Sequence, residues 1–144
     1  MPRALLDASV LFAAAYHRDS AHDDALPILQ GIDDGSLPEA VVLDYILAET
    51  LNGLTAHAGH DAAVDFLDRI EENERFHIEP VGRGALAAGK AAFRRYESFS
   101  FVDGCLVGYM QTDGLRYLYA FDDDFDVAED ISRLDTATNP YNPE

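Results

Sequence analysis

The sequence predicts an α/β domain with a mostly parallel central sheet of about four to five strands and helices on both faces. Short apolar segments alternate along the chain with longer segments whose apolar residues recur at helical spacing. Strands that alternate with helices pair in parallel, because each crossover returns the chain to the starting edge of the sheet. A chain of 144 residues can bury a core as one domain, which we expect over residues 1–137, followed by an unstructured tail over residues 138–144.

The first half of the chain is predicted to contain two strands and four helices. The first strand ends on Asp7, and Ser20 followed three residues later by Asp23 is typical of a capped helix start. In the helix after the second strand, Leu47, Ala48, Leu51 and Leu54 are the expected buried stripe, with Glu49 beside it. The expected order is strand 3–7, helix 10–15, a helix from residue 20, strand 39–43, helix 44–57 and helix 61–74.

The second half is predicted to supply the remaining strands around one strongly apolar helix. Five side chains recur at positions i, i+3, i+4, i+7 and i+8 of that helix, and Gly114 suits the position after its end. Residues 115–121 are almost continuously apolar, which indicates a central strand covered on both faces. The expected elements are strand 76–81, helix 83–96, a helix from 101 or 102 to 113, strand 115–121 and a short edge strand within 131–137.

Charge is the strongest signal in the composition. The chain has 27 acidic residues against 10 basic ones, for a net charge of −17. The acidic side chains of such a surface repel one another at low ionic strength. They are best tolerated in concentrated salt, where the Debye length falls to about 3 Å at 1 M. We therefore hypothesise a halophilic source that accumulates salt, such as a halophilic archaeon. A thermal melt that does not change between low and molar KCl would refute this hypothesis.

The single cysteine and the hydropathy pattern indicate the cellular compartment of the protein. Cys105 lies on the apolar stripe of its helix and reads as a small buried residue, and one cysteine cannot form a disulfide within the chain. No apolar run reaches the roughly 18–20 residues that span a bilayer. We expect a cytoplasmic protein with no membrane partner.

Four carboxylates stand where a parallel sheet would bring them together. In open α/β sheets, residues just past the strands and at the following helix starts converge on one rim. Each carboxylate alone could simply stabilise a helix N-terminus, but a cluster is costly without a cation. Oxygen ligands suit Mg²⁺ or Mn²⁺, which can activate water and stabilise attack on phosphorus. The residues are Asp7, Glu49, Asp103 and Asp122, and they predict a metal-dependent phosphoryl-transfer site.

Four short motifs around these carboxylates resemble those of PIN domains, and their order, spacing and overall length are similar to the small VapC-type toxins of toxin–antitoxin pairs. The motifs are Leu5-Leu-Asp-Ala-Ser9, Ala48-Glu49, Ser100-Phe-Val-Asp103 and Ala120-Phe-Asp-Asp-Asp-Phe125, and the resemblance covers nearly the whole chain. It implies a three-layer α/β/α fold, endoribonuclease activity with Mg²⁺ or Mn²⁺, a homodimer and a VapB-like antitoxin partner.

The resemblance also implies roles for individual residues. Asp7, Glu49, Asp103 and Asp122 would be the catalytic metal ligands, Asp124 an outer-shell or alternative ligand, and Ser9 the hydroxyl that orients a carboxylate or water. The chain departs from the family pattern at Ala120, where Ser or Thr is common. The candidates for contact with an RNA substrate are Arg18, Arg83, Arg94 and Arg95.

Other functions compete with this interpretation. A phosphoacceptor receiver domain would need paired acids after the first strand and a lysine after the last, and a haloacid-dehalogenase-type phosphatase would need an Asp where Ser9 stands. Neither pattern is present. A PIN nuclease that matures RNA without being a toxin, and a catalytically silent protein-binding module, both remain open.

Overall fold

The computed structural model describes residues 2–142 as a five-stranded sheet in the order β3-β2-β1-β4-β5, with every neighbouring pair parallel. The strands are β1 (Arg3–Leu6), β2 (Glu39–Leu43), β3 (Phe76–Glu79), β4 (Tyr117–Tyr119) and β5 (Ser132–Leu134). The helices are α1 (Ala8–Ala15), α2 (His22–Asp34), α3 (Asp44–Ala58), α4 (His60–Glu72), α5 (Arg83–Arg95), α6 (Phe101–Asp113) and the short 3-10 helix η1 (Asp123–Val127).

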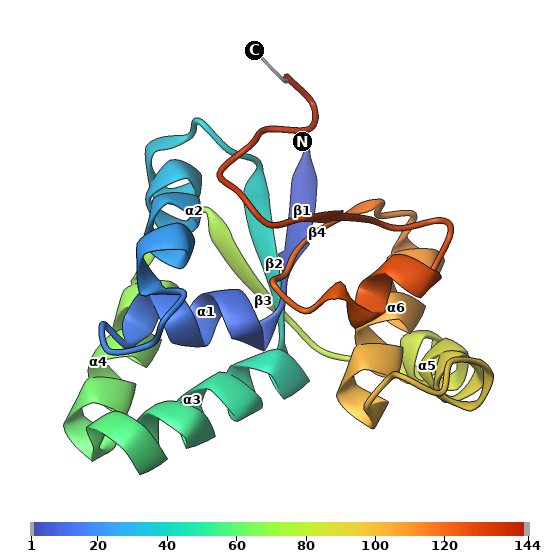
Figure 1. Ribbon diagram of the computed structural model, residues 1–144, viewed down its shortest axis with the longest axis horizontal. Helices are drawn as coiled ribbons and strands as arrows, with labels where there is room; N and C mark the ends of the chain where they lie inside the picture. Colours follow the sequence, from blue (N-terminus) through green and yellow to red (C-terminus); the bar gives the residue numbers. More distant parts are fainter. Residues whose placement is uncertain (1, 143–144) are drawn as a thin grey trace.

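The helices form two layers around the sheet. Helices α1 to α4 cover one face, and α5 and α6 cover the other (Figure 1). The chain runs outward from β1 to β2 and β3, then crosses to β4 and β5 on the opposite side of β1. The strand order therefore reverses between β1 and β4, which is the position where open α/β sheets place their binding crevice. The predicted three-layer α/β/α fold is confirmed.

Helices on both faces explain why the central strands are apolar without alternation. Leu5 and Leu6 of β1 and Val42 and Leu43 of β2 are all fully buried. A strand buried on one face only would alternate apolar and polar residues, whereas a strand covered on both faces has no solvent-facing side. This continuous burial fixes the carboxyl ends of β1 and β2 firmly in the core.

Two local predictions are wrong. Helix α2 begins at His22 after Ala21, and no side chain caps it. Asp19 Oδ1 accepts from the Ala21 N–H at 2.8 Å, just before the helix. In α3, Ala48 is exposed, and the buried side chains are Ile46, Thr50 and Leu54. Thr50 tolerates burial because its hydroxyl donates to the Ile46 carbonyl at 2.8 Å.

Helices α5 and α6 approach each other through glycines. A Cβ at Gly108 would lie 2.6 Å from the Ala85 carbonyl oxygen and would press on the Gly89 backbone as well. A Cβ at Gly104 would lie 2.8 Å from the Gly89 carbonyl oxygen. Only residues without a side chain allow two helix backbones this close, so these glycines set the position of α6 and with it that of Asp103.

The chain after β5 folds back over the amino end of the sheet. Residues 138–141 contain no helix or strand. The Tyr119 hydroxyl donates to the Thr138 carbonyl at 2.7 Å, and the Tyr141 hydroxyl donates to the Arg3 carbonyl at 2.9 Å. This segment, expected as an unstructured tail, thus has specific contacts at the edge opposite the predicted site (Figure 1).

Within residues 2–142, no helix combines the length and the apolarity needed to cross a bilayer.

Candidate functional site

The carboxyl ends of β1 and β4 are joined by hydrogen bonds that involve Asp7 and Ser9. The Asp7 N–H donates to the Tyr119 carbonyl at 3.0 Å, which extends the pairing of the two strands to Asp7. The Ser9 hydroxyl donates to Asp7 Oδ2 at 2.6 Å and accepts from the Phe121 N–H at 3.2 Å. Ser9 therefore connects the Asp7 carboxylate to the segment that leads into Asp122.

Asp7 is a buried carboxylate, with only 6% of its surface exposed. It is the N-cap of α1, where the Ser9 N–H also donates to Oδ2 at 3.3 Å. Burial raises the pKa of Asp7 above its ordinary value, the Ser9 hydrogen bonds oppose that rise, and the charge of Asp103 adds to it. The carboxylate is thus held rigidly and has few groups to balance its charge.

Asp103 lies in the first turn of α6 and forms a capping box with Ser100. The Asp103 N–H donates to the Ser100 hydroxyl at 3.1 Å, and the Ser100 N–H donates to Asp103 Oδ2 at 3.0 Å. These bonds explain why an acidic residue stabilises this helix start. Burial nevertheless raises the pKa of Asp103, and the charges of Asp122 and Asp124 raise it further. Helix capping therefore accounts for the position of Asp103 and leaves its charge unbalanced.

Glu49 and Asp122 come from the other two predicted positions. Glu49 is exposed in the second turn of α3, yet desolvation of its carboxyl raises its pKa, followed by the charges of Asp7 and Asp103. Asp122 is the N-cap of η1, where its Oδ1 accepts from the Asp124 N–H at 2.9 Å. The charge of Asp122 is the main cause that raises the pKa of Asp124.

These mutual effects define an acidic rim, whose members are Asp7, Glu49, Asp103, Asp122, Asp123 and Asp124. Its densest part is Asp122, Asp123 and Asp124, whose carboxylate oxygens lie within 4.8 Å of one another. In the described part of the chain, no other trio of potential metal ligands is this close. The donors are all carboxylate oxygens and repel one another, which is the chemistry that a hard divalent cation such as Mg²⁺ or Mn²⁺ satisfies. The residues present therefore fit such an ion.

The four predicted arginines are not gathered in one place. Arg18 follows α1, at the opposite end of that helix from Asp7. Arg83 begins the 13-residue helix α5, while Arg94 and Arg95 end it, about 16 Å away at the usual rise per residue. All four are exposed. Only Arg94 and Arg95 lie near the start of α6.

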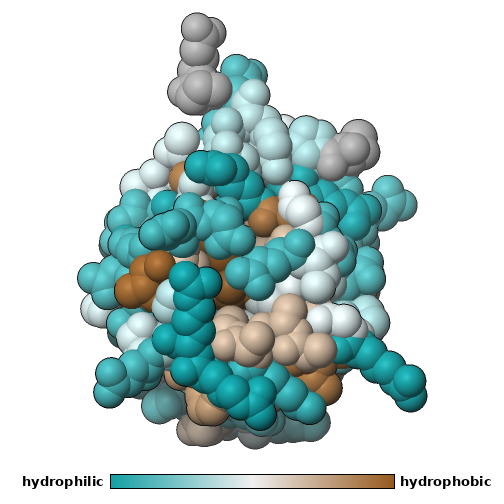
Figure 2. All heavy atoms as spheres, turned by 90° about the vertical axis from the view of Figure 1, so that its right-hand side faces the viewer, coloured by the Kyte–Doolittle hydropathy of each residue, from teal (hydrophilic) through white to brown (hydrophobic). Residues whose placement is uncertain are grey.

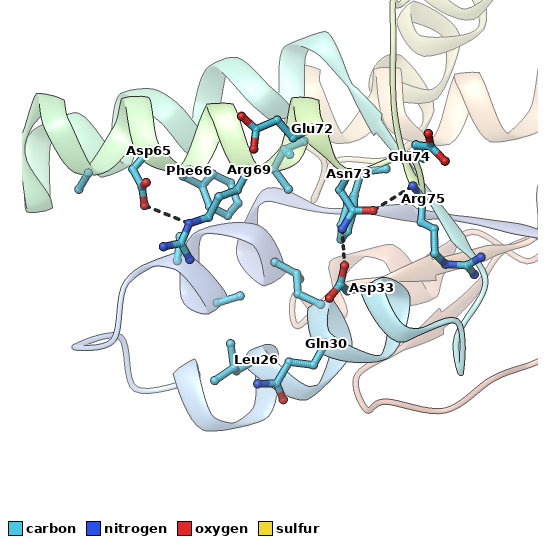
Figure 3. Close-up of a pocket in the computed structure, with 16 residues that line it drawn as sticks. Leu26, Gln30, Asp33, Asp65, Phe66, Arg69, Glu72, Asn73, Glu74 and Arg75 are labelled. Atoms are coloured by element: carbon cyan, nitrogen blue, oxygen red, sulfur yellow. Dashed lines mark hydrogen bonds and ion pairs between the residues drawn. The ribbon is translucent and has the colours of Figure 1, made fainter.

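A separate cavity of about 830 Å³ lies between α1, α2 and α4, and no residue of the acidic rim lines it (Figure 3). One wall carries Asp65 and Arg69, paired at 3.1 Å. At the other end, Arg75 donates through Nε to the Ile32 carbonyl at 2.6 Å and through Nη2 to the Leu37 carbonyl at 2.9 Å. Arg75 thereby fixes the end of α2 to the start of β3. The cavity has apolar and polar walls but no cluster of unpaired acids that would support chemistry.

Two residues of the site were not predicted from the sequence. Asp123 joins the densest acidic group, and the adjacent aspartates in the chain were the available signal. Ser100 positions Asp103, and a serine three residues before an acid at a helix start is the pattern that would have indicated it.

Comparison with known proteins identifies the family. The PIN domain family model matches residues 4–131. No curated protein sequence matches the chain significantly.

Several solved structures are similar over nearly the whole chain. VapC20 of Mycobacterium tuberculosis, a toxin that cleaves the sarcin-ricin loop, is 25% identical with a TM-score of 0.76, and the match covers 89% of this chain and 95% of that one. VapBC2 of Rickettsia felis, bound to a promoter DNA fragment, is 12% identical with a TM-score of 0.71 over 92% and 98%. FitAcB of Neisseria gonorrhoeae is 17% identical with a TM-score of 0.63 over 96% and 98%; these last two share the fold. The chain therefore belongs to the PIN domain family and is structurally similar to VapC toxins.

Proposed function

We propose that this protein is a metal-dependent endoribonuclease and the toxin of a VapBC-type toxin–antitoxin pair. The observation that carries the proposal is the convergence of Asp7, Glu49, Asp103 and Asp122 on the strand-order reversal between β1 and β4. Burial and the charges of neighbouring acids raise the pKa values of the first three. The family membership and the similarity to VapC20 support the same activity.

In this proposal the acidic rim holds Mg²⁺ or Mn²⁺, with Asp124 as a further ligand. When bound, such an ion lowers the pKa of water and stabilises the charge that develops on the phosphate oxygens during hydrolysis. Ser9 keeps the Asp7 carboxylate in one orientation through its 2.6 Å bond, and the Ser100 capping box does the same for Asp103. In each case the oxygen that accepts these bonds is Oδ2.

The partners follow from the same similarity. We propose a VapB-like antitoxin, because similar structures include toxin–antitoxin complexes from Klebsiella pneumoniae and Rickettsia felis. We also propose a homodimer, which rests on the resemblance to VapC-type toxins alone. An RNA-maturation nuclease and a silent binding module predict different outcomes. The first would cleave RNA but would not arrest growth when expressed alone, and the second would bind a partner without any cleavage.

The test is RNA cleavage by the purified protein in molar KCl. With Mg²⁺ or Mn²⁺ we expect internal cleavage of a single-stranded RNA, and with excess EDTA we expect none, because the acidic rim alone repels the phosphate. Gel analysis of end-labelled RNA measures both. Cleavage that persists undiminished in EDTA contradicts the metal mechanism, and the absence of cleavage with either metal contradicts the nuclease.

A further inference from the structure

Two phenylalanines are exposed at the junction of α5 and α6. Phe93 is 45% exposed and Phe101 is 38% exposed, although both are large apolar side chains. Their rings form a T-shaped pair, with centroids 5.6 Å apart and planes at 78°. Apolar surface interrupts the hydrophilic surface on the side of the molecule that carries α5 and α6 (Figure 2). An exposed aromatic pair of this kind is typical of a binding surface.

The backbone of this pair adjoins the turn of α6 that carries Asp103. Phe101 is two residues before Asp103, in the same first turn of α6. The backbone nitrogen and Cβ of Phe93 each lie 3.2 Å from the position that a Cβ on Gly104 would occupy, and Gly104 is the residue after Asp103. Both rings therefore extend from backbone that packs against the Asp103 turn.

Basic side chains flank the aromatic pair. Lys90 is three residues before Phe93 and four before Arg94, so the three share one side of α5. Residues 90–95 carry three of the ten basic residues of a chain with net charge −17. Within residues 2–142, neither Lys90, Arg94 nor Arg95 forms an ion pair with an acid, although Arg69, Arg75 and Arg133 do. Arg95 instead lies over the Tyr96 ring at 5.0 Å.

We propose that Lys90, Phe93, Arg94 and Phe101 form a platform that binds single-stranded RNA, with bases stacked on the phenylalanines and phosphates facing the cations. We call this surface the α5–α6 platform. The inference rests on the proposed function and extends it to how the substrate is held. Aromatic rings next to cations are the common device for unpaired nucleic acid, since a base presents its flat face only when it is not enclosed in a duplex.

The charge of the protein makes stacking the main source of affinity on this platform. Phosphate contacts weaken as salt rises, because binding releases counterions. A surface with few cations and many acids therefore gains little from charge in concentrated salt. Stacking buries apolar area and does not depend on counterion release, so it persists under those conditions.

The test measures RNA binding separately from cleavage. A fluorescein-labelled single-stranded RNA of about 12 nucleotides, within the usual site size for such surfaces, is titrated in EDTA and followed by anisotropy. We expect the double variant Phe93→Ala/Phe101→Ala to bind about 10- to 100-fold more weakly, as loss of base stacking typically gives. The double variant Phe93→Trp/Phe101→Tyr keeps an aromatic ring at both positions and should bind RNA as the wild type does. The control Val64→Ala alters a residue on α4 that is 41% exposed and should leave affinity unchanged.

Salt dependence distinguishes the two kinds of contact. Arg94→Gln should make the slope of log affinity against log KCl shallower by about 1, which is the effect of losing one phosphate contact. The phenylalanine variants should leave that slope unchanged. Circular dichroism melts check that each variant is folded. Phenylalanine variants that bind RNA as the wild type does overturn the platform. A change in molar mass by light scattering with unchanged RNA affinity also overturns it and assigns the surface to a second copy of this chain.

The same samples separate the platform from the nuclease. If the wild type cleaves RNA with Mg²⁺ and the phenylalanine variants keep its kcat/KM, the platform is wrong and the nuclease stands. If the wild type binds RNA through the phenylalanines but cleaves nothing, the nuclease is wrong and the platform stands. A wild type that binds no single-stranded RNA in EDTA overturns the platform, and its cleavage of RNA with Mg²⁺ then decides the nuclease separately.

Discussion

Asp7→Asn is expected to abolish RNA cleavage and at the same time to raise the stability of the metal-free protein. The proposed ion loses a charged ligand at the centre of the acidic rim. Changes to outer residues of metal sites already cost about 10- to 100-fold, so we expect a loss of about 100-fold or more in kcat/KM. Cleavage of end-labelled RNA with saturating Mg²⁺ measures it.

The stability change follows from the raised pKa of Asp7. A carboxyl whose pKa is higher in the folded state than the ordinary 3.8 contributes its full stability below that value and loses it as pH rises through the folded pKa. The ionised wild type is therefore penalised at pH 8, whereas asparagine is neutral at every pH. Relief of such functional strain typically gives about 0.5–2 kcal/mol. Thermal melts in EDTA should show Asp7→Asn above the wild type at pH 8 and level with it below pH 3.8.

Asp44→Asn is the matched control, because Asp44 follows β2 as Asp7 follows β1, but its carboxylate accepts from the Tyr45 and Val81 N–H groups at 2.9 and 3.1 Å. It should retain cleavage and gain no stability. An Asp7→Asn protein that cleaves normally would remove Asp7 from the site, and one that is less stable than the wild type at pH 8 would contradict the strain argument.

Gly108→Ala is expected to destabilise the fold by about 3 kcal/mol. The added methyl would lie 2.6 Å from the Ala85 carbonyl oxygen and 2.9 Å from the Ala88 carbonyl carbon. These are backbone atoms, so α5 and α6 must separate to make room for the methyl group. Overpacking of this kind costs about 1–3 kcal/mol or more. That cost exceeds the roughly 1 kcal/mol that alanine gains over glycine through its higher helix propensity. Urea titration in high salt measures the loss. Cleavage should fall too, because α6 carries Asp103.

Gly84→Ala makes the same chemical change on α5 at a place where a Cβ would meet nothing within 4 Å. It should leave stability unchanged or raise it by up to about 1 kcal/mol. If both substitutions behave alike, the close approach of α5 and α6 does not limit the packing of this domain.

Element types were predictable because hydrophobic spacing reflects which faces are buried. The helix at Asp103 was placed to within a residue at its start, and Gly114 ends it in the left-handed conformation, with a φ of 67°. The start of α2 was not predictable, because Ser20 and Asp19 are both of residue types that cap helices, yet neither side chain caps this one. Asp19 bonds to the Ala21 N–H before the helix instead. The burial of Ala48 was predicted wrongly for a similar reason. Alanine is common both in the core and at the surface, so only the packing of the helix decides which side it faces.

The sequence by itself determined the parallel α/β class and the positions of the acids, because both follow from patterns local to each segment. Only the tertiary structure decided that the charge of Asp103 acts on Asp7 and that of Asp122 on Asp103. It also decided that Ser9 joins β1 to the end of β4 and that Phe93 meets Phe101. The physical reason is that these contacts depend on strand order and helix approach. Strand order comes from packing the whole chain, and the approach of α5 to α6 depends on glycines that leave no hydrophobic signal.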